Sequence, residues 1–227
     1  MLDDEAIEIP SVVPVFPLPE VVLFPRAVLP LHVFEPRYRE MTADALDGAG
    51  IVAIALLKPG FEPRYYSLRA PIHRILGLGE IAASEQLDDG NYNILLRGVA
   101  RARISKELPH KPYRVARVEP LESPADVPCS TLNTLRQELR QTVETEFVGD
   151  REVQEHWLRL FGTPLELGDL TDLIASVLPI DAELRQDLLA QPNPATRSMA
   201  LREHIHTLAA ITQTRRRQCR NGDWKMN

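Results

Sequence analysis

The sequence predicts an α+β fold in which a β-rich half is followed by an all-helical half. Between Val12 and Leu121, short segments rich in β-branched residues are separated by turn signals. From Ser123 onward, apolar residues recur three and four positions apart, which is the period of an amphipathic helix. The segment SPADVP between the two patterns is typical of a linker. We therefore expect a β-rich domain over residues 10–122 and a helical bundle domain over residues 123–227.

Six segments of the first half are typical of strands. They read VVPVF, AVLPLHVF, IVAIALL, HRILGLGEIAA, YNILLRGVARARI and YRVARVEPL. Asp89-Gly90 precedes YNILL, and glycine adopts the positive φ that tight hairpin turns need, so a hairpin is predicted there. Gly77-Leu78-Gly79 lies within a strand-like run. It is interpreted as a bulge or barrel bend, because a phosphate-binding glycine loop would open a helix instead.

Residues 16–41 combine five prolines with many Val, Leu and Phe residues. Pro14, Pro17 and Pro19 are expected to keep the entry chain extended, because proline favours extended or edge-strand positions, whereas Pro25 and Pro30 are expected to interrupt strand pairing. Pro36 is expected to start the only helix of this half, and Gly48 to end it. The apolar face of that helix would consist of Tyr38, Met41, Ala45 and Leu46.

Helix signals in the second half are equally local. Asp181 is predicted to cap a short helix, and Asn193-Pro194 to open a long final one, since Asn is a good cap and Pro suits the first turn. The helix before Asp181 carries a continuous apolar stripe, formed by Leu170, Leu173, Ile174, Val177 and Leu178.

Composition narrows the class of protein. The chain has 227 residues, 44% of them hydrophobic, and a net charge of −6. No apolar run is long enough to span a membrane, and the acidic N-terminus is unlike a secretory signal, so we expect a cytoplasmic protein. The negative charge disfavours nucleic-acid binding. The basic cluster at residues 214–220 is interpreted as a solvated helix end, and Cys129 and Cys219 as free thiols.

The first segment, VFPLPEVVLFPRAVLPLHVFEPRYREM, resembles the opening of the N-terminal, substrate-binding domain of ATP-dependent Lon proteases. IVAIALLKPG, LGLGEIAASEQLDDGNYNILLRGVARARI and YRVARVEPLE are similar to later motifs of that domain, with LDDG where the family usually has LPDG. The resemblance implies a PUA-like pseudo-barrel with one inserted helix, followed by a helical bundle, in a standalone bacterial form. The motif residues expected to be structural are Pro17, Pro25, Pro30, Phe34, Glu35, Pro36, Arg37 and Tyr38.

Catalytic motifs are missing from the sequence. None of its lysines (Lys58, Lys106, Lys111 and Lys225) is followed by Ser or Thr, so no P-loop is present. HExxH and GxSxG motifs are absent as well. We therefore expect a protein that lacks the ATPase and peptidase of Lon, uses no cofactor or metal and is not an enzyme.

The loop from Lys58 to Pro71 is the candidate binding element. Phe61, Arg64, Tyr65 and Tyr66 lie close together in it, and aromatic residues with Arg are typical of recognition surfaces. The alternative is that these side chains fold back onto the barrel as a lid.

The leading hypothesis is a recognition protein for unfolded or exposed polypeptide segments, which it would dock to a protease or chaperone. The resemblance to Lon and the missing catalytic motifs favour it. A PUA-like RNA-binding protein and an unrecognised hydrolase remain as alternatives.

Overall fold

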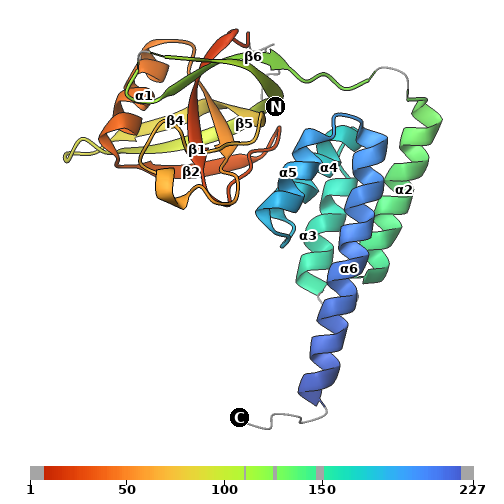
Figure 1. Ribbon diagram of the computed structural model, residues 1–227. Helices are drawn as coiled ribbons and strands as arrows, with labels where there is room; N and C mark the ends of the chain where they lie inside the picture. Colours follow the sequence, from red (N-terminus) through yellow and green to blue (C-terminus); the bar gives the residue numbers. More distant parts are fainter. Residues whose placement is uncertain (1–7, 110, 125–126, 147–150, 221–227) are drawn as a thin grey trace. The chain divides into compact units, whose positions relative to one another are not determined.

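The computed structural model describes residues 8–109, 111–124, 127–146 and 151–220 (Figure 1). The chain forms two compact units. The first consists of the residues up to Glu122 together with Ala175–Pro192, and the second of Ser123–Ile174 and the residues from Asn193. This division differs from the predicted domains at one segment, because residues 175–192 group with the strands.

The first unit is built on a mixed sheet of six strands in the order β2-β5-β4-β3-β1-β6. Only the pair β1–β3 is parallel. The strands are β1 (Val12–Leu18), β2 (Val28–Val33), β3 (Ile51–Leu56), β4 (Ile75–Gln86), β5 (Tyr92–Leu108) and β6 (Arg114–Pro120).

The length of β5 closes the sheet into a barrel. The first part of this strand pairs with β2, and its last part, from Ala102 to Leu108, pairs with β6. Since β6 also pairs with β1, five strands form a ring and β2 remains at the edge. Every residue of β3 is buried, as expected of a strand with neighbours on both sides. The predicted α+β class is confirmed.

Pro14 and Pro17 lie in the extended strand β1, as predicted, although this strand is not at a sheet edge. β1 lies between β3 and β6, but residues 12–14 pair only with β6 and residues 16–18 only with β3, while Val15 between them pairs with both strands. Pro14 and Pro17 therefore each lie where the strand has a single neighbour, so the missing N–H breaks no ladder. Pro30 does not interrupt pairing either, because it lies within the edge strand β2 opposite Leu95.

The inserted helix α1 (Pro36–Asp47) begins at Pro36 and ends before Gly48, as predicted. Its buried face contains Tyr38, Met41 and Ala45, but Thr42 completes it in place of Leu46, which is 40% exposed. The Thr42 hydroxyl donates to the Tyr38 carbonyl oxygen at 2.9 Å, which satisfies its polar atom inside the core.

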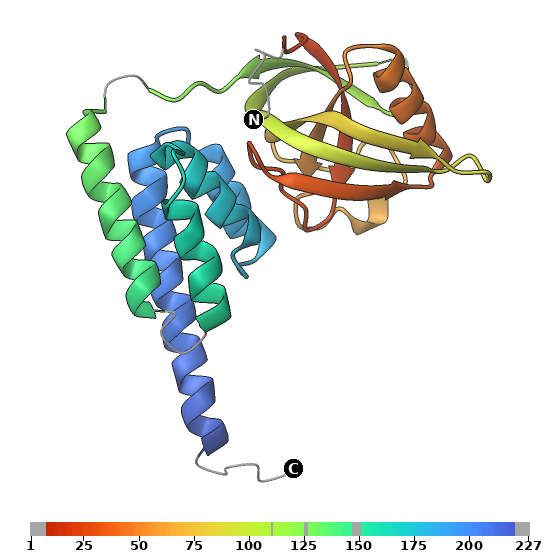
Figure 2. The ribbon, with the colours of Figure 1, turned by 180° about the vertical axis from the view of Figure 1, so that it is seen from behind.

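Two features of β4 and β5 follow from glycine. The predicted hairpin turn is present, with Gly90 at φ 79° and the Leu87 amide donating to the Asn91 carbonyl oxygen (Figure 2). The pairing of β4 with β5 shifts register between Leu78 and Gly79, so the predicted bulge is confirmed. Gly77 and Gly98 also lie against the backbone of Leu23 and Phe24, which no larger residue would allow.

The helix α5 (Ala182–Ala190) packs on β4 within the first unit. Asp181 caps it as predicted, accepting from the Leu184 amide at 2.8 Å. Its Gln186 side chain is buried and donates to the carbonyl oxygen of Ile75 at 2.9 Å. The buried Arg101 of β5 donates to the Leu189 carbonyl oxygen. These bonds explain why α5 belongs with the barrel.

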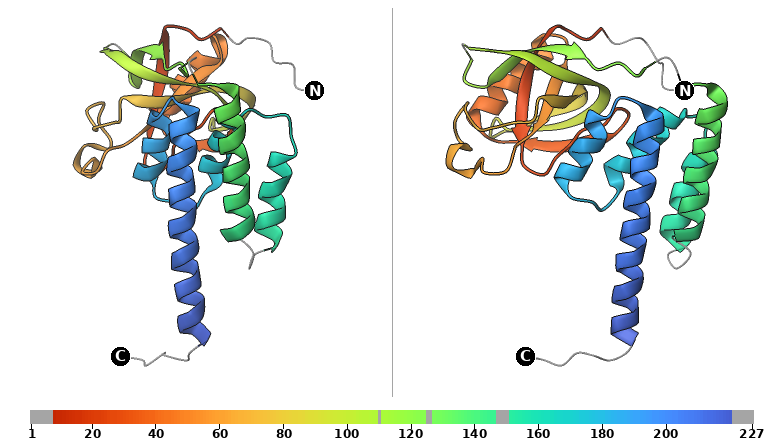
Figure 3. Two further views of the ribbon diagram at one scale, coloured as in Figure 1. Left: turned by 90° about the vertical axis from the view of Figure 1, so that its right-hand side faces the viewer. Right: turned by 45° about the vertical axis from the view of Figure 1, so that its right-hand side comes forward.

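The second unit contains helices that lie side by side (Figure 3). They are α2 (Cys129–Glu146), α3 (Arg151–Phe161), α4 (Leu167–Val177) as far as Ile174, and α6 (Pro194–Arg220). Asn193 caps α6 as predicted, accepting from the Ala195 amide at 2.9 Å. Arg197 of α6 forms an ion pair of 3.0 Å with Asp172 of α4, and both side chains are almost fully buried.

The remaining predictions concern the basic cluster, the two cysteines and membrane-spanning segments. The side chains of the basic cluster at residues 215–220, including Cys219, lie outside the described residues. Cys129 is an exposed free thiol. In the described part of the chain, no helix is both long and apolar enough to cross a membrane.

Candidate functional site

The loop between β3 and β4 is held closed at its base. The Lys58 amide donates to the Pro71 carbonyl oxygen at 2.8 Å, and Leu57 forms a β-bridge with Ile72. The short 3-10 helix η1 (Glu62–Arg64) lies within the loop. Both ends of the loop are therefore tied to the barrel.

The four residues predicted to bind do not share one environment. Phe61 and Tyr65 are half-buried and pack against the barrel core, with ring centroids 5.7 Å apart. Tyr66 is 85% exposed and meets the edge of Tyr65 with 5.0 Å between centroids. Arg64 is exposed as well. The two alternatives for this loop thus apply to different residues: two rings fold back onto the barrel, and Tyr66 and Arg64 face solvent.

Arg37 joins this loop to the start of α1. Its guanidinium forms an ion pair of 2.9 Å with Glu35 and donates to the Tyr65 carbonyl oxygen at 3.4 Å. It also lies over the Tyr38 ring, 4.5 Å from the centroid. Burial raises the pKa of Tyr38 to about 12, and burial followed by the negative charge of Glu35 raises the pKa of Tyr65. The opening motif and the loop are separate in the sequence, but in the structure Arg37 of the motif contacts Tyr65 of the loop.

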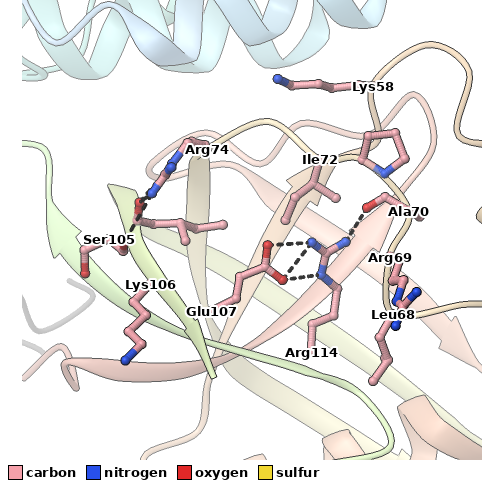
Figure 4. Close-up of a pocket in the computed structure, with 12 residues that line it drawn as sticks. Lys58, Leu68, Arg69, Ala70, Ile72, Arg74, Ser105, Lys106, Glu107 and Arg114 are labelled. Atoms are coloured by element: carbon pink, nitrogen blue, oxygen red, sulfur yellow. Dashed lines mark hydrogen bonds and ion pairs between the residues drawn. The ribbon is translucent and has the colours of Figure 1, made fainter. Parts of the chain in front are cut away.

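A cleft of about 660 Å³ lies beside the same loop (Figure 4). At its centre, Arg114 of β6 forms an ion pair with Glu107 of β5. The Arg114 Nη2 atom donates to both carboxylate oxygens of Glu107, each at 2.8 Å. Arg114 also donates to the carbonyl oxygen of Ala70 at 2.5 Å, which fixes the end of the loop to the barrel. The lining residues are Lys58, Leu68, Arg69, Ala70, Pro71, Ile72, Arg74, Ile104, Ser105, Lys106, Glu107 and Arg114.

Sequence reasoning missed this cleft, although one signal pointed to it. Arg114 alternates in phase with Ala116 and Val118, which are buried, so the strand pattern places a guanidinium on the core-facing side. A buried Arg needs a partner, and Glu107 supplies it. Glu107 lies in another strand, so its spacing in the sequence gives no hint of the pair.

The described residues offer no metal centre. No group of three His, Cys, Asp or Glu side chains in this part of the chain is arranged to hold an ion. His32 is exposed, and its Nδ1 lies 2.9 Å from the amide oxygen of Asn93.

The chain is similar to known proteins of one family. Residues 12–207 match the family described as "ATP-dependent protease La (LON) substrate-binding domain". The chain belongs to this family. The Lon protease of Geobacter metallireducens is 29% identical over 218 residues, which cover 90% of this chain and 25% of that protein. The Lon protease of Dictyoglomus thermophilum is 30% identical over 115 residues, covering 51% of this chain and 14% of that protein.

Solved structures of Lon N-terminal domains share the fold. The N-terminal domain of Mycobacterium avium complex Lon protease superposes with a TM-score of 0.67 at 17% identity, covering 86% of this chain and 98% of that one. A Lon N-terminal domain protein from Xanthomonas campestris gives a TM-score of 0.59 at 21% identity, covering 84% and 96%. The chain spans about 25% of the length of the Lon proteases of Geobacter metallireducens and Trichlorobacter lovleyi.

The residues of the Lon motif take different positions in this chain. Pro36 starts α1, and the buried ring of Tyr38 packs on Phe16 with 4.2 Å between centroids. Phe34 lies at the surface rather than in the core, because its side chain is 62% exposed and its ring centroid is 6.2 Å from that of His32. Pro25 lies in the turn after Phe24, where that segment crosses the glycines of β4 and β5.

Proposed function

We propose that this chain is a non-catalytic protein that binds exposed segments of unfolded polypeptides in the cytoplasm and presents them to a protease or chaperone. One observation carries the proposal. Tyr66 is 85% exposed on a loop whose base and inner rings are held against the barrel. An aromatic side chain offered to solvent from a rigid support is typical of a binding hot spot, because little conformational entropy is lost when it is covered.

Membership of the Lon substrate-binding family supports the same proposal. The shared region is the part of Lon that is named for substrate binding, and it corresponds to about 25% of the length of the matched Lon proteases. The sequence offers no P-loop lysine. Recognition of a polypeptide needs no ATP hydrolysis, so the missing P-loop lysine is consistent with this proposal.

Fluorescence anisotropy with a labelled, reduced and alkylated protein as an unfolded client tests the proposal. Tyr66→Ala should weaken binding about fivefold to thirtyfold, which corresponds to about 1–2 kcal/mol for an aromatic hot spot. Met199→Ala is a suitable control, because Met199 is 53% exposed on α6 of the second unit. The same client in its native, folded form should not bind. If the unfolded client fails to bind the wild-type protein, the proposed function is wrong.

A further inference from the structure

The cleft beside the loop is strongly basic although the whole chain is acidic. Five basic side chains and one acidic side chain line it, in a protein with a net charge of −6. Cations gathered against the average charge of a chain create a local positive potential, which attracts anionic partners. The charge of the cleft is therefore opposite in sign to the net charge of the chain.

Two of the five basic side chains, Arg74 and Arg114, already form hydrogen bonds within the protein. Arg74 donates to the carbonyl oxygens of Ile104 and Ser105 at 2.8 and 3.1 Å. Arg114 is saturated by Glu107 and the Ala70 carbonyl oxygen. The same ion pair neutralises Glu107, so the only carboxylate of the cleft is not available to cancel the remaining positive charge.

Three cations remain for a ligand. The side chains of Lys58, Arg69 and Lys106 are exposed, and within the described residues none of them has a hydrogen-bonding or ion-pair partner. They come from three different segments and surround the Arg114–Glu107 pair (Figure 4). An extended ligand crossing the ion pair would meet positive charge on more than one side.

The floor between these cations is apolar and partly open. Ile72 and Ile104 are buried there, and Leu68 is 44% exposed at the rim. The β5 backbone beside this floor is already hydrogen-bonded, because the Ile104 amide donates to the Arg74 carbonyl oxygen at 2.8 Å and the Arg74 side chain donates to the carbonyl oxygens of Ile104 and Ser105. A ligand in the cleft would therefore be held by the cationic and apolar side chains.

We propose that this cleft binds acidic side chains of an extended client segment, with Lys58, Arg69 and Lys106 contacting carboxylates and the Ile72–Ile104 floor taking an apolar side chain between them. The inference rests on the proposed function and narrows it to clients in which acidic and apolar residues alternate. A volume of about 660 Å³ suits a short segment of this kind.

A nucleic acid fits the same cleft less well. Single strands are usually held by aromatic rings on which bases stack, and none of the twelve lining residues is aromatic. The net charge of −6 also disfavours binding of a long polyanion. Carboxylates beside apolar side chains match both the charges and the floor.

Fluorescence anisotropy with labelled decapeptides tests the inference in the full chain. One peptide alternates Glu and Leu, and its partner replaces every Glu with Gln. At low salt the Glu peptide should bind at least fivefold more tightly, and Arg69→Gln combined with Lys106→Gln should abolish that preference. Arg140→Gln combined with Arg159→Gln removes the same charge from exposed positions on α2 and α3, and should leave the preference intact.

The possible results separate the two proposals. Equal affinity for both peptides, or a preference that survives the cleft substitutions, overturns the acidic-client inference. If the unfolded client still binds and Tyr66→Ala still weakens it, the broader recognition function stands. A single-stranded RNA that binds more tightly than the Glu peptide, and loses affinity with the cleft substitutions, would assign the cleft to nucleic acid instead.

Discussion

Gly98 should tolerate no side chain, and Gly98→Ala provides a quantitative test of the barrel. A Cβ at this position would lie 1.9 Å from the carbonyl oxygen of Phe24 and 2.8 Å from its carbon. Real Cβ atoms essentially never approach closer than 3.0 Å, so the Phe24 segment would have to move by about 1.1 Å. Phe24 is fully buried, and that movement would disturb the core around it.

The cost follows from the bonds that hold the two segments together. The Arg26 amide donates to the Gly98 carbonyl oxygen at 2.7 Å, and the Gly98 amide donates to the Ala27 carbonyl oxygen at 2.8 Å. Lengthening both bonds costs about 1 kcal/mol each, and overpacking the core adds about 1–3 kcal/mol. We therefore expect Gly98→Ala to lower the free energy of unfolding of the first unit by about 3–5 kcal/mol.

Urea unfolding followed by circular dichroism, with hydrogen exchange of the β5 amides, measures the effect on this unit. At a slope of about 2 kcal/mol per molar urea, the midpoint for the barrel should fall by roughly 2 M. Gly168→Ala is the matched control, since its nearest neighbour is Arg197 Nη2 at 3.6 Å and it should be close to neutral. A change below about 0.5 kcal/mol in Gly98→Ala would refute the argument from close approach.

Three further predictions address other parts of the chain. Asp172→Asn should destabilise the second unit by about 3–5 kcal/mol because it breaks a buried ion pair by removing the charge of one partner; urea unfolding followed by tryptophan fluorescence measures this. Arg114→Met should raise hydrogen exchange of the Lys58 amide about tenfold or more, since it frees the end of the loop; unchanged exchange would contradict this role. The pKa of Tyr38, about 12 when folded, lies above the usual value of 10.0, so stability should be complete below pH 10 and decline up to about pH 12, and Tyr38→Phe should reduce that decline in urea unfolding at each pH.

Local signals in the sequence were sufficient for several element boundaries. Pro36 starts α1, Asp181 caps α5, and Gly90 makes the β4–β5 turn, all as predicted. Each of these signals acts through the backbone of the next two or three residues. A sequence pattern can therefore predict the start of a helix or the position of a turn without information on the residues that surround the element.

The candidate site was only partly predictable. The composition of residues 58–71 drew attention to Tyr66, but the same composition could not separate the exposed ring from the packed rings of Phe61 and Tyr65. Which ring faces solvent depends on the barrel surface beneath the loop. The link between Arg37 and Tyr65 spans 28 positions, and no local pattern encodes it.

The sequence by itself determined the α+β class, the family and the ends of several helices and turns, because these depend on periodicity and on contacts between near neighbours. Only the tertiary structure decided how the prolines of β1 fit inside the sheet, why α5 belongs with the barrel, and that Arg114 and Glu107 build a basic cleft. Each of these features requires two segments that are distant in the chain, or adjacent strands in a particular register, to meet. These contacts between distant segments depend on the pairing of β5 with both β2 and β6, which is a property of the whole barrel.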